Sequence, residues 1–437
     1  MEKEKIIEIL SEWNFWGDGI ETGIERDVLS HSFGIVNSRV NKILAITGVR
    51  RCGKSFLSKQ IAKRYIDLSG EKNTLIVNFE EVSFDEELSG KFLLDIFEAY
   101  NEIVGPTKKP LIILDEVQRV MGWERFVRSL HEKNKARIIV TGSSSKLMSE
   151  ELATLLTGRT VDVKLLPLSF REFLRFRGFE PKKKLDILTK KEKIRRMMRE
   201  YLKFGGFPEV TLEDNKKMRK EILRKIYEDV ILKDVVLRLR IKNFMKLEVL
   251  ANFYTTNFSS PITFNSISRF LNLPVKTVEI YSKGLEISNL FFFLRRFSFS
   301  IKEQEKSPRK VYLVDNGLFT STGFRTSDNF GKLMENLVFL ELKRRASADT
   351  GIFYWRDPYQ REVDFVVKDG RRVRELIQVC YDISDPNTKR REEKSLIRGG
   401  KELGCRNLSI ITWDYEGEER IGGKRIGYIP LWKWIFR

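Results

Sequence analysis

A strand, a glycine-bearing loop and a helix follow one another within residues 43–64, and this order restricts the possible fold more than any other feature. The apolar run 43–47, Ile-Leu-Ala-Ile-Thr, is typical of a buried strand. It leads into Gly-Val-Arg-Arg-Cys-Gly-Lys-Ser at 48–55, and apolar residues recur at helical spacing after Ser55. Gly48 and Gly53 let the backbone curl so that its N–H groups converge beside the positive end of the helix. The segment therefore predicts a phosphate cradle.

The cradle assigns a role to each of its polar residues. Lys54 is expected to reach the β- and γ-phosphates of ATP, and the Ser55 hydroxyl to bind Mg²⁺. A chance match is the alternative; the bare pattern should occur in roughly one random chain in fifty, and the strand–helix context lowers that figure. The residues expected to contact the nucleotide are Gly48, Val49, Arg50, Arg51, Cys52, Gly53, Lys54, Ser55 and Phe56.

A second buried strand, Leu-Ile-Ile-Leu-Asp-Glu at 111–116, supplies the acidic half of a nucleoside-triphosphatase site. Asp115 is expected to hold the Mg²⁺ shell and Glu116 to polarise the attacking water. The alternative is a helix start, where carboxylates are also favourable. A glutamate directly after the aspartate favours hydrolysis over binding alone.

Two further residues complete the predicted catalytic set. Ser143 follows a third strand, 137–141, where a hydroxyl is expected to sense the γ-phosphate. Arg159, in Thr-Gly-Arg at 157–159, offers a charge that can stabilise the transition state in its own subunit or in a neighbour's. Exposed arginines are common in a basic chain, so a purely structural Arg159 is an equal alternative.

Length and composition exclude several classes of protein. A chain of 437 residues predicts two to four domains. It has no run of 18 apolar residues and no secretory signal, which predicts a cytoplasmic protein without a membrane span. Three widely spaced cysteines and two histidines argue against a disulfide framework and against a Cys- or His-based metal centre.

The charge is strongly basic and unevenly distributed. The net charge is +19, and residues 182–203 are rich in Lys and Arg. This imbalance favours contact with nucleic acid, because phosphate backbones attract basic surfaces. A solvated, charge-rich helix surface is the alternative.

Residues 241–300 have the order of a winged helix. A helix after Pro261, a turn at 272–274, a second helix at 275–287 and an apolar strand at 290–297 are expected. Lys276, Thr277, Glu279 and Lys283 then lie on the recognition helix, and Arg295 and Arg296 lie on the wing. The DNA-binding interpretation and protein packing both remain open for this region.

The last third of the chain carries scattered carboxylates on apolar elements. Endonuclease-like folds place an Asp at one strand end and Glu-x-Lys on the next, to bind Mg²⁺ and steady a hydroxide. Asp364 takes the first position and Glu335 lies on an apolar helix, but Gln378 and Cys380 fill the Glu and Lys positions. Because side chains alternate between the two faces of a strand, Glu375 is misplaced for the Glu position of this motif unless the strand bulges. A degenerate nuclease scaffold that binds DNA or assists assembly is therefore favoured over a nuclease.

These segments together resemble a known family: prokaryotic, largely archaeal AAA-type ATPases with a winged-helix region and a C-terminal endonuclease-like region. The resemblance implies an ATPase core, a helical lid and a homo-oligomer, for which a ring is one arrangement. The strings that carry it are 48–55, Ile-Ile-Leu-Asp-Glu-Val-Gln at 112–118, Thr-Gly-Ser-Ser-Ser at 141–145, Leu-Pro-Leu-Ser-Phe-Arg-Glu-Phe-Leu at 166–174, Gly-Gly-Phe-Pro-Glu-Val at 205–210 and Glu-Val-Asp-Phe-Val-Val at 362–367.

The expected fold class is α/β, a parallel P-loop NTPase sheet with a helical lid, a winged-helix domain and a C-terminal α/β endonuclease-like domain. The leading functional hypothesis is a DNA-associated ATPase; a nucleotide-controlled switch for a protein partner and an ATP-dependent nuclease are the alternatives. The expected parts are an N-terminal helix and connector at 1–30, the ATPase core at 31–170, the lid at 171–240, the winged helix at 241–300 and the nuclease-like domain at 301–437.

Overall fold

The computed structural model describes residues 1–17, 20–85, 87–142, 156–241, 243–322 and 329–437. The chain separates into two compact units. The first contains Met1–Leu166 and Ile287–Asn289, and the second contains Pro167–Glu286 and Leu290–Arg437.

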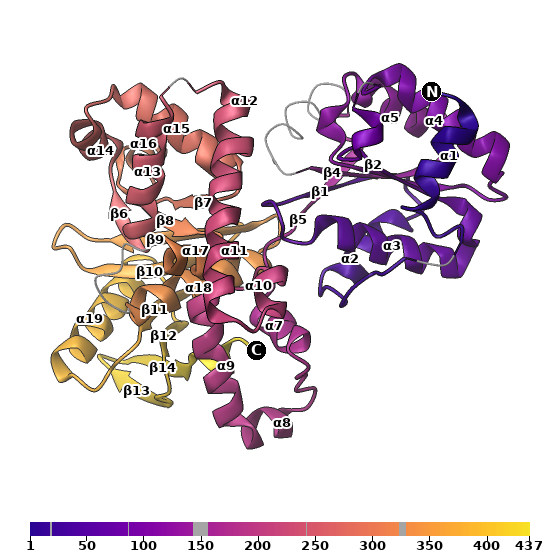
Figure 1. The fold of residues 1–437 in the computed structure, drawn as a ribbon. Coiled ribbons are helices and arrows are strands. Elements are labelled where there is room, and N and C mark those ends of the chain that lie inside the picture. Colours follow the sequence, from indigo (N-terminus) through magenta and orange to yellow (C-terminus); the bar gives the residue numbers. More distant parts are fainter. Residues whose placement is uncertain (18–19, 86, 143–155, 242, 323–328) are drawn as a thin grey trace. The chain divides into compact units, whose positions relative to one another are not determined.

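The first unit is a parallel sheet covered by helices on both faces (Figure 1). The strand order is β2-β3-β4-β1-β5 and every pairing is parallel. The three central strands are almost entirely buried because helices cover both of their faces, as expected for aliphatic parallel strands. The strands are β1 (Ile43–Thr47), β2 (Thr74–Asn78), β3 (Leu111–Asp115), β4 (Arg137–Gly142) and β5 (Thr160–Lys164).

Two groups of helices flank this sheet. The first group, α1, α4 and α5, lies on one face, and α2 and α3 lie on the other (Figure 1). The helices are α1 (Lys3–Ser11), α2 (Leu29–Val36), α3 (Lys54–Ser69), α4 (Gly90–Ala99) and α5 (Trp123–Glu132). The parallel α/β core expected from the sequence is confirmed; the edge strand β5 was not expected, because its polar and apolar residues alternate as in an exposed strand.

The second unit starts with helices and continues into a small antiparallel sheet of order β6-β8-β7. The helices are α7 (Phe170–Phe176), α8 (Lys184–Thr189), α9 (Lys191–Phe204), α10 (Pro208–Leu212), α11 (Lys216–Asp229), α12 (Leu237–Leu239), α13 (Phe244–Thr256), α14 (Phe264–Leu271), α15 (Val275–Ile287), α16 (Ile301–Lys306) and α17 (Asn316–Ser321). The strands are β6 (Ser260–Ile262), β7 (Phe291–Leu294) and β8 (Arg309–Leu313).

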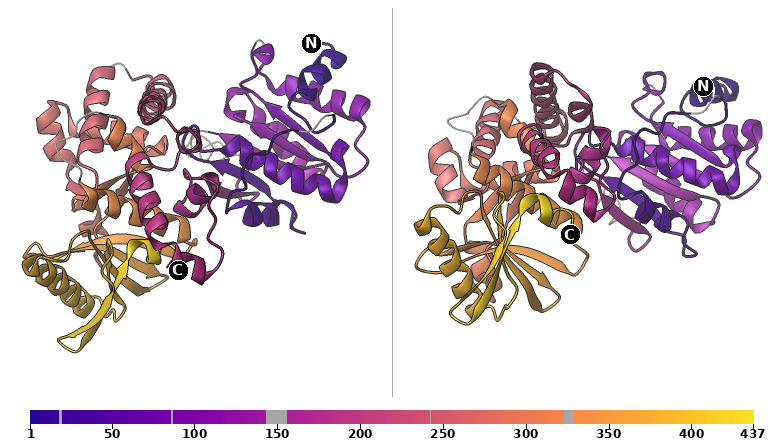
Figure 2. Two further views of the ribbon diagram at one scale, coloured as in Figure 1. Left: turned by 60° about the horizontal axis from the view of Figure 1, so that its bottom comes forward. Right: turned by 90° about the horizontal axis from the view of Figure 1, so that it is seen from below.

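A mixed six-stranded sheet of order β13-β14-β12-β11-β10-β9 forms the C-terminal part of this unit (Figure 2). The helices α18 (Phe330–Arg345) and α19 (Pro386–Glu402) pack against it, and α20 (Leu431–Trp434) follows its last strand. The strands are β9 (Thr350–Arg356), β10 (Glu362–Asp369), β11 (Arg372–Cys380), β12 (Leu408–Thr412), β13 (Gly417–Ile421) and β14 (Lys424–Pro430). The fold is therefore α/β, with a parallel P-loop sheet and a separate mixed sheet near the C-terminus.

Candidate functional site

The loop 48–53 joins the carboxyl end of β1 to the first turn of α3. A Cβ atom on Gly48 would lie 2.2 Å from the carbonyl oxygen of Leu165, so the close approach of these two segments requires glycine. Gly53 has a φ of 98°, in the left-handed region that glycine enters without strain. The two glycines that the sequence pattern selects are thus needed for the shape of the loop.

Lys54 points into the curl of this loop. Its side chain is 5% exposed, and its Nζ atom donates to the carbonyl oxygens of Gly48, at 3.3 Å, and Val49, at 3.4 Å. The same Nζ atom lies 3.6 Å from Oε1 of Glu116, which follows β3. The structure thus brings Lys54 and Glu116 together from segments about 60 residues apart in the sequence.

Asp115, at the carboxyl end of β3, is the buried carboxylate of the site. Burial is the main cause that raises the pKa of Asp115, and the charge of Glu116 raises it further. Hydrogen bonds from the hydroxyls of Ser55 and Thr141 lower it. A serine hydroxyl beside a carboxylate is a set of oxygen donors that suits Mg²⁺, so these residues fit the expected metal.

Glu116 is held by contacts that the sequence did not reveal. Its backbone has a φ of 54°, and its N–H donates to Oγ1 of Thr141 at 3.1 Å. Oε2 of Glu116 accepts a hydrogen bond from the Nε2 amide of Gln118. Gln118 lies two residues beyond Glu116 and belongs to the string 112–118 that the sequence analysis singled out. The sequence did not indicate, however, that its side chain contacts Glu116.

Arg26 supports the loop from behind. Its buried guanidinium donates from Nη1 to the carbonyl oxygen of Cys52 at 2.7 Å and from Nη2 to that of Leu166 at 2.8 Å. Arg26 therefore joins the phosphate loop to Leu166, which lies two residues after the end of β5. A single arginine in the N-terminal connector carries no sequence signal that would have identified this role.

The remaining loop residues differ in exposure. Cys52 is buried, and Nη1 of Arg50 lies 3.2 Å from Oε1 of Glu80. Phe56, in the first turn of α3, is 47% exposed. An exposed aromatic ring next to the phosphate loop is available to contact a nucleotide.

Arg159 lies at the opposite end of β1 from the phosphate loop. Its carbonyl oxygen accepts a hydrogen bond from the N–H of Ile43, the first residue of β1, while the loop follows the last residue, Thr47. A strand of this length spans about 16 Å. The guanidinium instead pairs with Glu132 at 2.9 Å, so the structure does not bring Arg159 to the site of its own chain.

Ser143, the other predicted catalytic residue, lies outside the described residues. The strand before it, β4, ends at Gly142 and lies between β3 and β1, next to both halves of the site.

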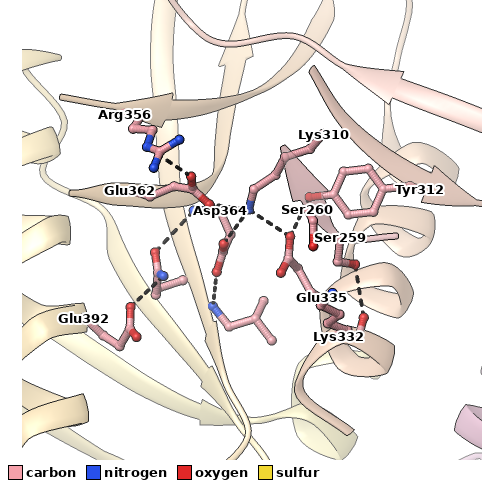
Figure 3. Close-up of polar contacts among 12 residues, drawn as sticks. Ser259, Ser260, Lys310, Tyr312, Lys332, Glu335, Arg356, Glu362, Asp364 and Glu392 are labelled. Atoms are coloured by element: carbon pink, nitrogen blue, oxygen red, sulfur yellow. Dashed lines mark hydrogen bonds and ion pairs between the residues drawn. The ribbon is translucent and has the colours of Figure 1, made fainter. Parts of the chain in front are cut away.

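The C-terminal carboxylates Glu335 and Asp364 also converge, on a lysine that the sequence analysis missed (Figure 3). Nζ of Lys310 lies 2.9 Å from Oε1 of Glu335, 2.8 Å from Oδ1 of Asp364 and 2.7 Å from Oε1 of Glu362. The signal available in the sequence was a lysine directly before the run Val-Tyr-Leu-Val at 311–314, which is typical of a buried strand.

Gln378 and Cys380, which stand where the Glu-x-Lys motif has Glu and Lys, both form hydrogen bonds. Nε2 of Gln378 donates to Oε2 of Glu392 at 2.7 Å, and Sγ of Cys380 donates to the carbonyl oxygen of Asp382. The pairing of β10 with β11 shifts register between Val367 and Lys368, yet Glu375 still points elsewhere and accepts from Oγ of Ser409. Glu375 therefore stays outside the cluster, as strand alternation predicts.

Three of the four basic residues predicted to contact DNA have partners within the second unit. Nζ of Lys283 lies 2.6 Å from Glu286, and Nη1 of Arg295 lies 2.6 Å from Glu305. Nη2 of Arg296 donates to the carbonyl oxygen of Arg356. Lys276 is exposed on α15.

A more strongly basic surface lies on α9. Exposed Arg196 and Arg199 and half-buried Arg195 line a hollow of about 350 Å³, together with Lys193 and Glu192. The guanidinium of Arg199 lies 5.2 Å from the ring centre of Trp413, and Nζ of Lys193 lies 4.2 Å from that of Phe179.

The arginines of this surface differ in their ion pairs. Nη2 of Arg195 lies 2.9 Å from Oδ2 of Asp414, which neutralises its charge. Among the described residues, no carboxylate pairs with Arg196 or Arg199.

Within the described ranges, no group of three or more His, Cys, Asp or Glu side chains is arranged to hold a metal ion. In the same part of the chain, no helix has the length and apolar character needed to cross a membrane.

Family comparisons divide the chain into three segments. Residues 40–174 match the family described as AAA domain, and residues 195–328 and 330–433 match domains of unknown function, DUF8612 and DUF4143. The uncharacterized protein MJ1544 of Methanocaldococcus jannaschii is 36% identical over 403 residues, which cover 90% of this chain and 88% of that protein. An uncharacterized protein of Haemophilus influenzae is 29% identical over 399 residues, covering 89% and 94%. The chain therefore belongs to the family of MJ1544, and residues 40–174 are an AAA-type P-loop domain.

Solved structures show weaker similarity. The ORC1 protein of Aeropyrum pernix, in complex with DNA, has a TM-score of 0.31 at 12% identity and covers 76% of this chain and 97% of its own. AMPPCP-bound DnaA of Aquifex aeolicus has a TM-score of 0.25 at 15% identity and covers 60% and 86%. Similarity at this level does not bear on the function of the chain.

Proposed function

We propose that this member of the MJ1544 family is an ATPase that hydrolyses ATP with Mg²⁺ at the phosphate loop. The observation that carries the proposal is the convergence of Lys54 and Glu116, whose Nζ and Oε1 atoms lie 3.6 Å apart beside the buried carboxylate of Asp115. A cation for the phosphates, a carboxylate for the metal and a second carboxylate for water are the groups that phosphoryl transfer requires.

Each residue has a separate task in this proposal. Lys54 leaves Glu116 to bind the β- and γ-phosphates, because a polyphosphate carries more charge than one carboxylate. Ser55 and Asp115 hold the metal, which when bound offsets the charge that develops on the transferred phosphoryl group. Glu116, still hydrogen-bonded to Gln118, orients and polarises the attacking water.

Two substitutions test these roles. Glu116→Gln should lower the turnover number by roughly 10²- to 10⁴-fold and leave ATP affinity nearly unchanged. Lys54→Ala should weaken both ATP binding and turnover. Turnover is measured by phosphate release and affinity by titration with a fluorescent ATP analogue, with Glu71→Gln on the surface as the matched control. Unchanged turnover in Glu116→Gln would refute the role of this residue as the catalytic base.

We further propose that the ATPase acts on DNA or is regulated by it, with residues 241–300 as a winged helix and residues 171–240 as a lid. The α9 surface supports this proposal, because Arg196 and Arg199 are exposed and, in the part of the chain that the structure describes, neither forms an ion pair with a carboxylate. Guanidinium groups suit phosphate oxygens. Lys276 and Lys283 of α15 form the second candidate contact, although Glu286 pairs with Lys283 and Glu279 follows Lys276 by three residues on the same helix.

The salt dependence of DNA binding separates the two surfaces. Each lost phosphate contact should reduce the slope of log K against log salt by about 0.9 for duplex DNA. Substitution of both Arg196 and Arg199 by Ala should therefore reduce the slope by roughly 2, whereas the same change at Lys276 and Lys283 should have a smaller effect. Fluorescence anisotropy with duplex, single-stranded and branched DNA measures the slope, and ATP turnover is followed with the same DNAs. An unchanged slope in the arginine variant would exclude the α9 surface.

A nucleotide-controlled switch that binds a protein partner is the second candidate. Apolar side chains at helical spacing on α13, Met245 and Val249, are 75% and 44% exposed, and Phe270 of α14 is 62% exposed. An exposed apolar surface of this kind suits a protein partner better than phosphates. ATP turnover that is indifferent to every DNA tested would favour the switch.

Homo-oligomerisation completes the proposal. Arg159 lies at the end of β1 remote from its own phosphate loop, and its side chain is one-third exposed. These two observations support a role for Arg159 at the nucleotide of a neighbouring subunit. Glu132 holds Arg159 until that contact forms.

A further inference from the structure

The carboxylate cluster of the C-terminal region is built around a buried ammonium group. Lys310, in the middle strand of the β6-β8-β7 sheet, is 1% exposed. Its Nζ atom lies between 2.7 and 2.9 Å from three carboxylate oxygens, one each from Glu335, Glu362 and Asp364 (Figure 3). An ammonium group has three protons, so each proton has one carboxylate acceptor.

An endonuclease-like centre would hold Mg²⁺ with these same carboxylates, and the donor set does not fit that ion. Mg²⁺ requires several oxygen ligands at about 2.0–2.1 Å in near-octahedral geometry. Oδ1 of Asp364 is bound to Lys310, and Oδ2 accepts from the backbone N–H of Val379 at 3.0 Å. Oε1 of Glu335 accepts from both Lys310 and the hydroxyl of Tyr312.

The third ligand position of such a centre is also occupied. Oε1 of Gln378 accepts from the backbone N–H of Asp364 at 3.2 Å, and its Nε2 atom donates to Glu392 at 2.7 Å. The side chain is neutral and both of its polar atoms are used. The Sγ atom of Cys380 donates to the carbonyl oxygen of Asp382, and a thiol group does not supply the charge of the lysine it replaces.

The charges in the cluster are already largely offset. Lys310 and Arg356, whose Nε atom lies 3.8 Å from Glu362, supply two positive charges against three carboxylates. A further divalent cation would leave the buried cluster with an excess of positive charge.

We infer that Lys310 is the built-in cation of this centre, occupies the place of a divalent metal, and thereby makes the C-terminal region a metal-independent, non-cleaving element. The ammonium also joins parts of the second unit, because Lys310 belongs to β8 while its partners belong to α18 and β10. Motion of the small sheet against the six-stranded sheet has to break two buried contacts of one ammonium group, those to Glu362 and Asp364 of β10. The inference does not depend on the ATPase proposal.

The alternative is that Lys310 assists a hydroxide on a metal held by the same carboxylates, as in an active nuclease. Metal binding separates the two ideas. The full-length chain is titrated with Mn²⁺ in the absence of nucleotide, and bound Mn²⁺ is counted by electron paramagnetic resonance. Wild type and Asp364→Asn should bind the same number of ions; loss of one equivalent in Asp364→Asn would overturn the inference.

Substitution of the lysine provides the second test. Lys310→Met should lower the midpoint of thermal unfolding by about 5 °C or more, because buried carboxylates lose their counter-ion, whereas Lys306→Met on the exposed α16 should not. A thermal midpoint in Lys310→Met equal to that of the control would contradict a built-in cation. If Lys310→Met does not fold, the comparison of wild type with Asp364→Asn still decides.

DNA cleavage supplies the last readout. Supercoiled DNA incubated with the wild-type chain and Mn²⁺ should stay intact. Cleavage by the wild type that Asp364→Asn abolishes would show a working metal centre and refute the inference.

Discussion

Asp315 offers a stability prediction that follows directly from the structure. This 3%-exposed carboxylate lies at the start of α17. Its oxygens accept from the backbone N–H groups of Gly206, at 2.6 Å, and Gly317, at 2.8 Å. Burial nevertheless raises the pKa of Asp315 from 3.8 to about 7, because two amide donors and the charge of Arg344 do not replace the lost water.

The sign of the pH effect follows from this raised pKa. In the unfolded chain Asp315 loses its proton near pH 4, whereas in the folded chain it keeps the proton to about pH 7. The folded state therefore binds more protons between these values, and stability falls as the pH rises through the interval. A change from 3.8 to about 7 corresponds to roughly 4 kcal/mol at 1.36 kcal/mol per pKa unit. This value is an upper bound, because water that enters on ionisation reduces it.

The variant Asp315→Asn isolates this contribution. Its free energy of unfolding in urea is compared with that of wild type from pH 4.5 to 8, and the pH dependence of Glu335 and other groups cancels in the difference. Between pH 4.5 and 8 wild type should lose up to roughly 3 kcal/mol relative to Asp315→Asn, because the part of the effect below pH 4.5 lies outside this range. Asp349→Asn, at an exposed position, is the matched control. A difference that stays constant or increases with pH would refute the reasoning.

Three further predictions concern the nucleotide site. Gln118→Ala should reduce ATP turnover by about tenfold with little change in ATP affinity, since Glu116 loses its orienting hydrogen bond; an equal loss of affinity would contradict a positioning role. Arg26→Ala should weaken ATP binding by about tenfold in a fluorescent-nucleotide titration, since the loop loses its buried tie; unchanged affinity would exclude this role. Equal mixtures of inactive Arg159→Ala and Lys54→Ala chains should regain part of the wild-type turnover if Arg159 acts in a neighbouring subunit, and no regain would rule that out.

The arrangement of the loop 48–55 and the end of β3, where we propose that the nucleotide binds, was largely predictable from the sequence because its parts are local. Gly48, Lys54 and Ser55 lie in one strand–loop–helix segment, and Asp115 and Glu116 end a second buried strand. Carboxyl ends of neighbouring parallel strands meet at one edge of a sheet, so chain order alone places these groups together. The parallel sheet itself followed from the same alternation of strands and helices.

Only the tertiary structure decided the contacts between distant segments. Lys310 meets Asp364 across 54 residues, and Arg159 lies at the remote end of β1, where the strand pairing puts it. The net charge showed that basic residues are abundant. It did not show that Glu305 neutralises Arg295 whereas Arg196 forms no ion pair with a carboxylate of the described residues. Local patterns specify a backbone turn and the residues within it. The partner of a charged group, in contrast, is the distant side chain that tertiary packing places within a few ångströms of that group.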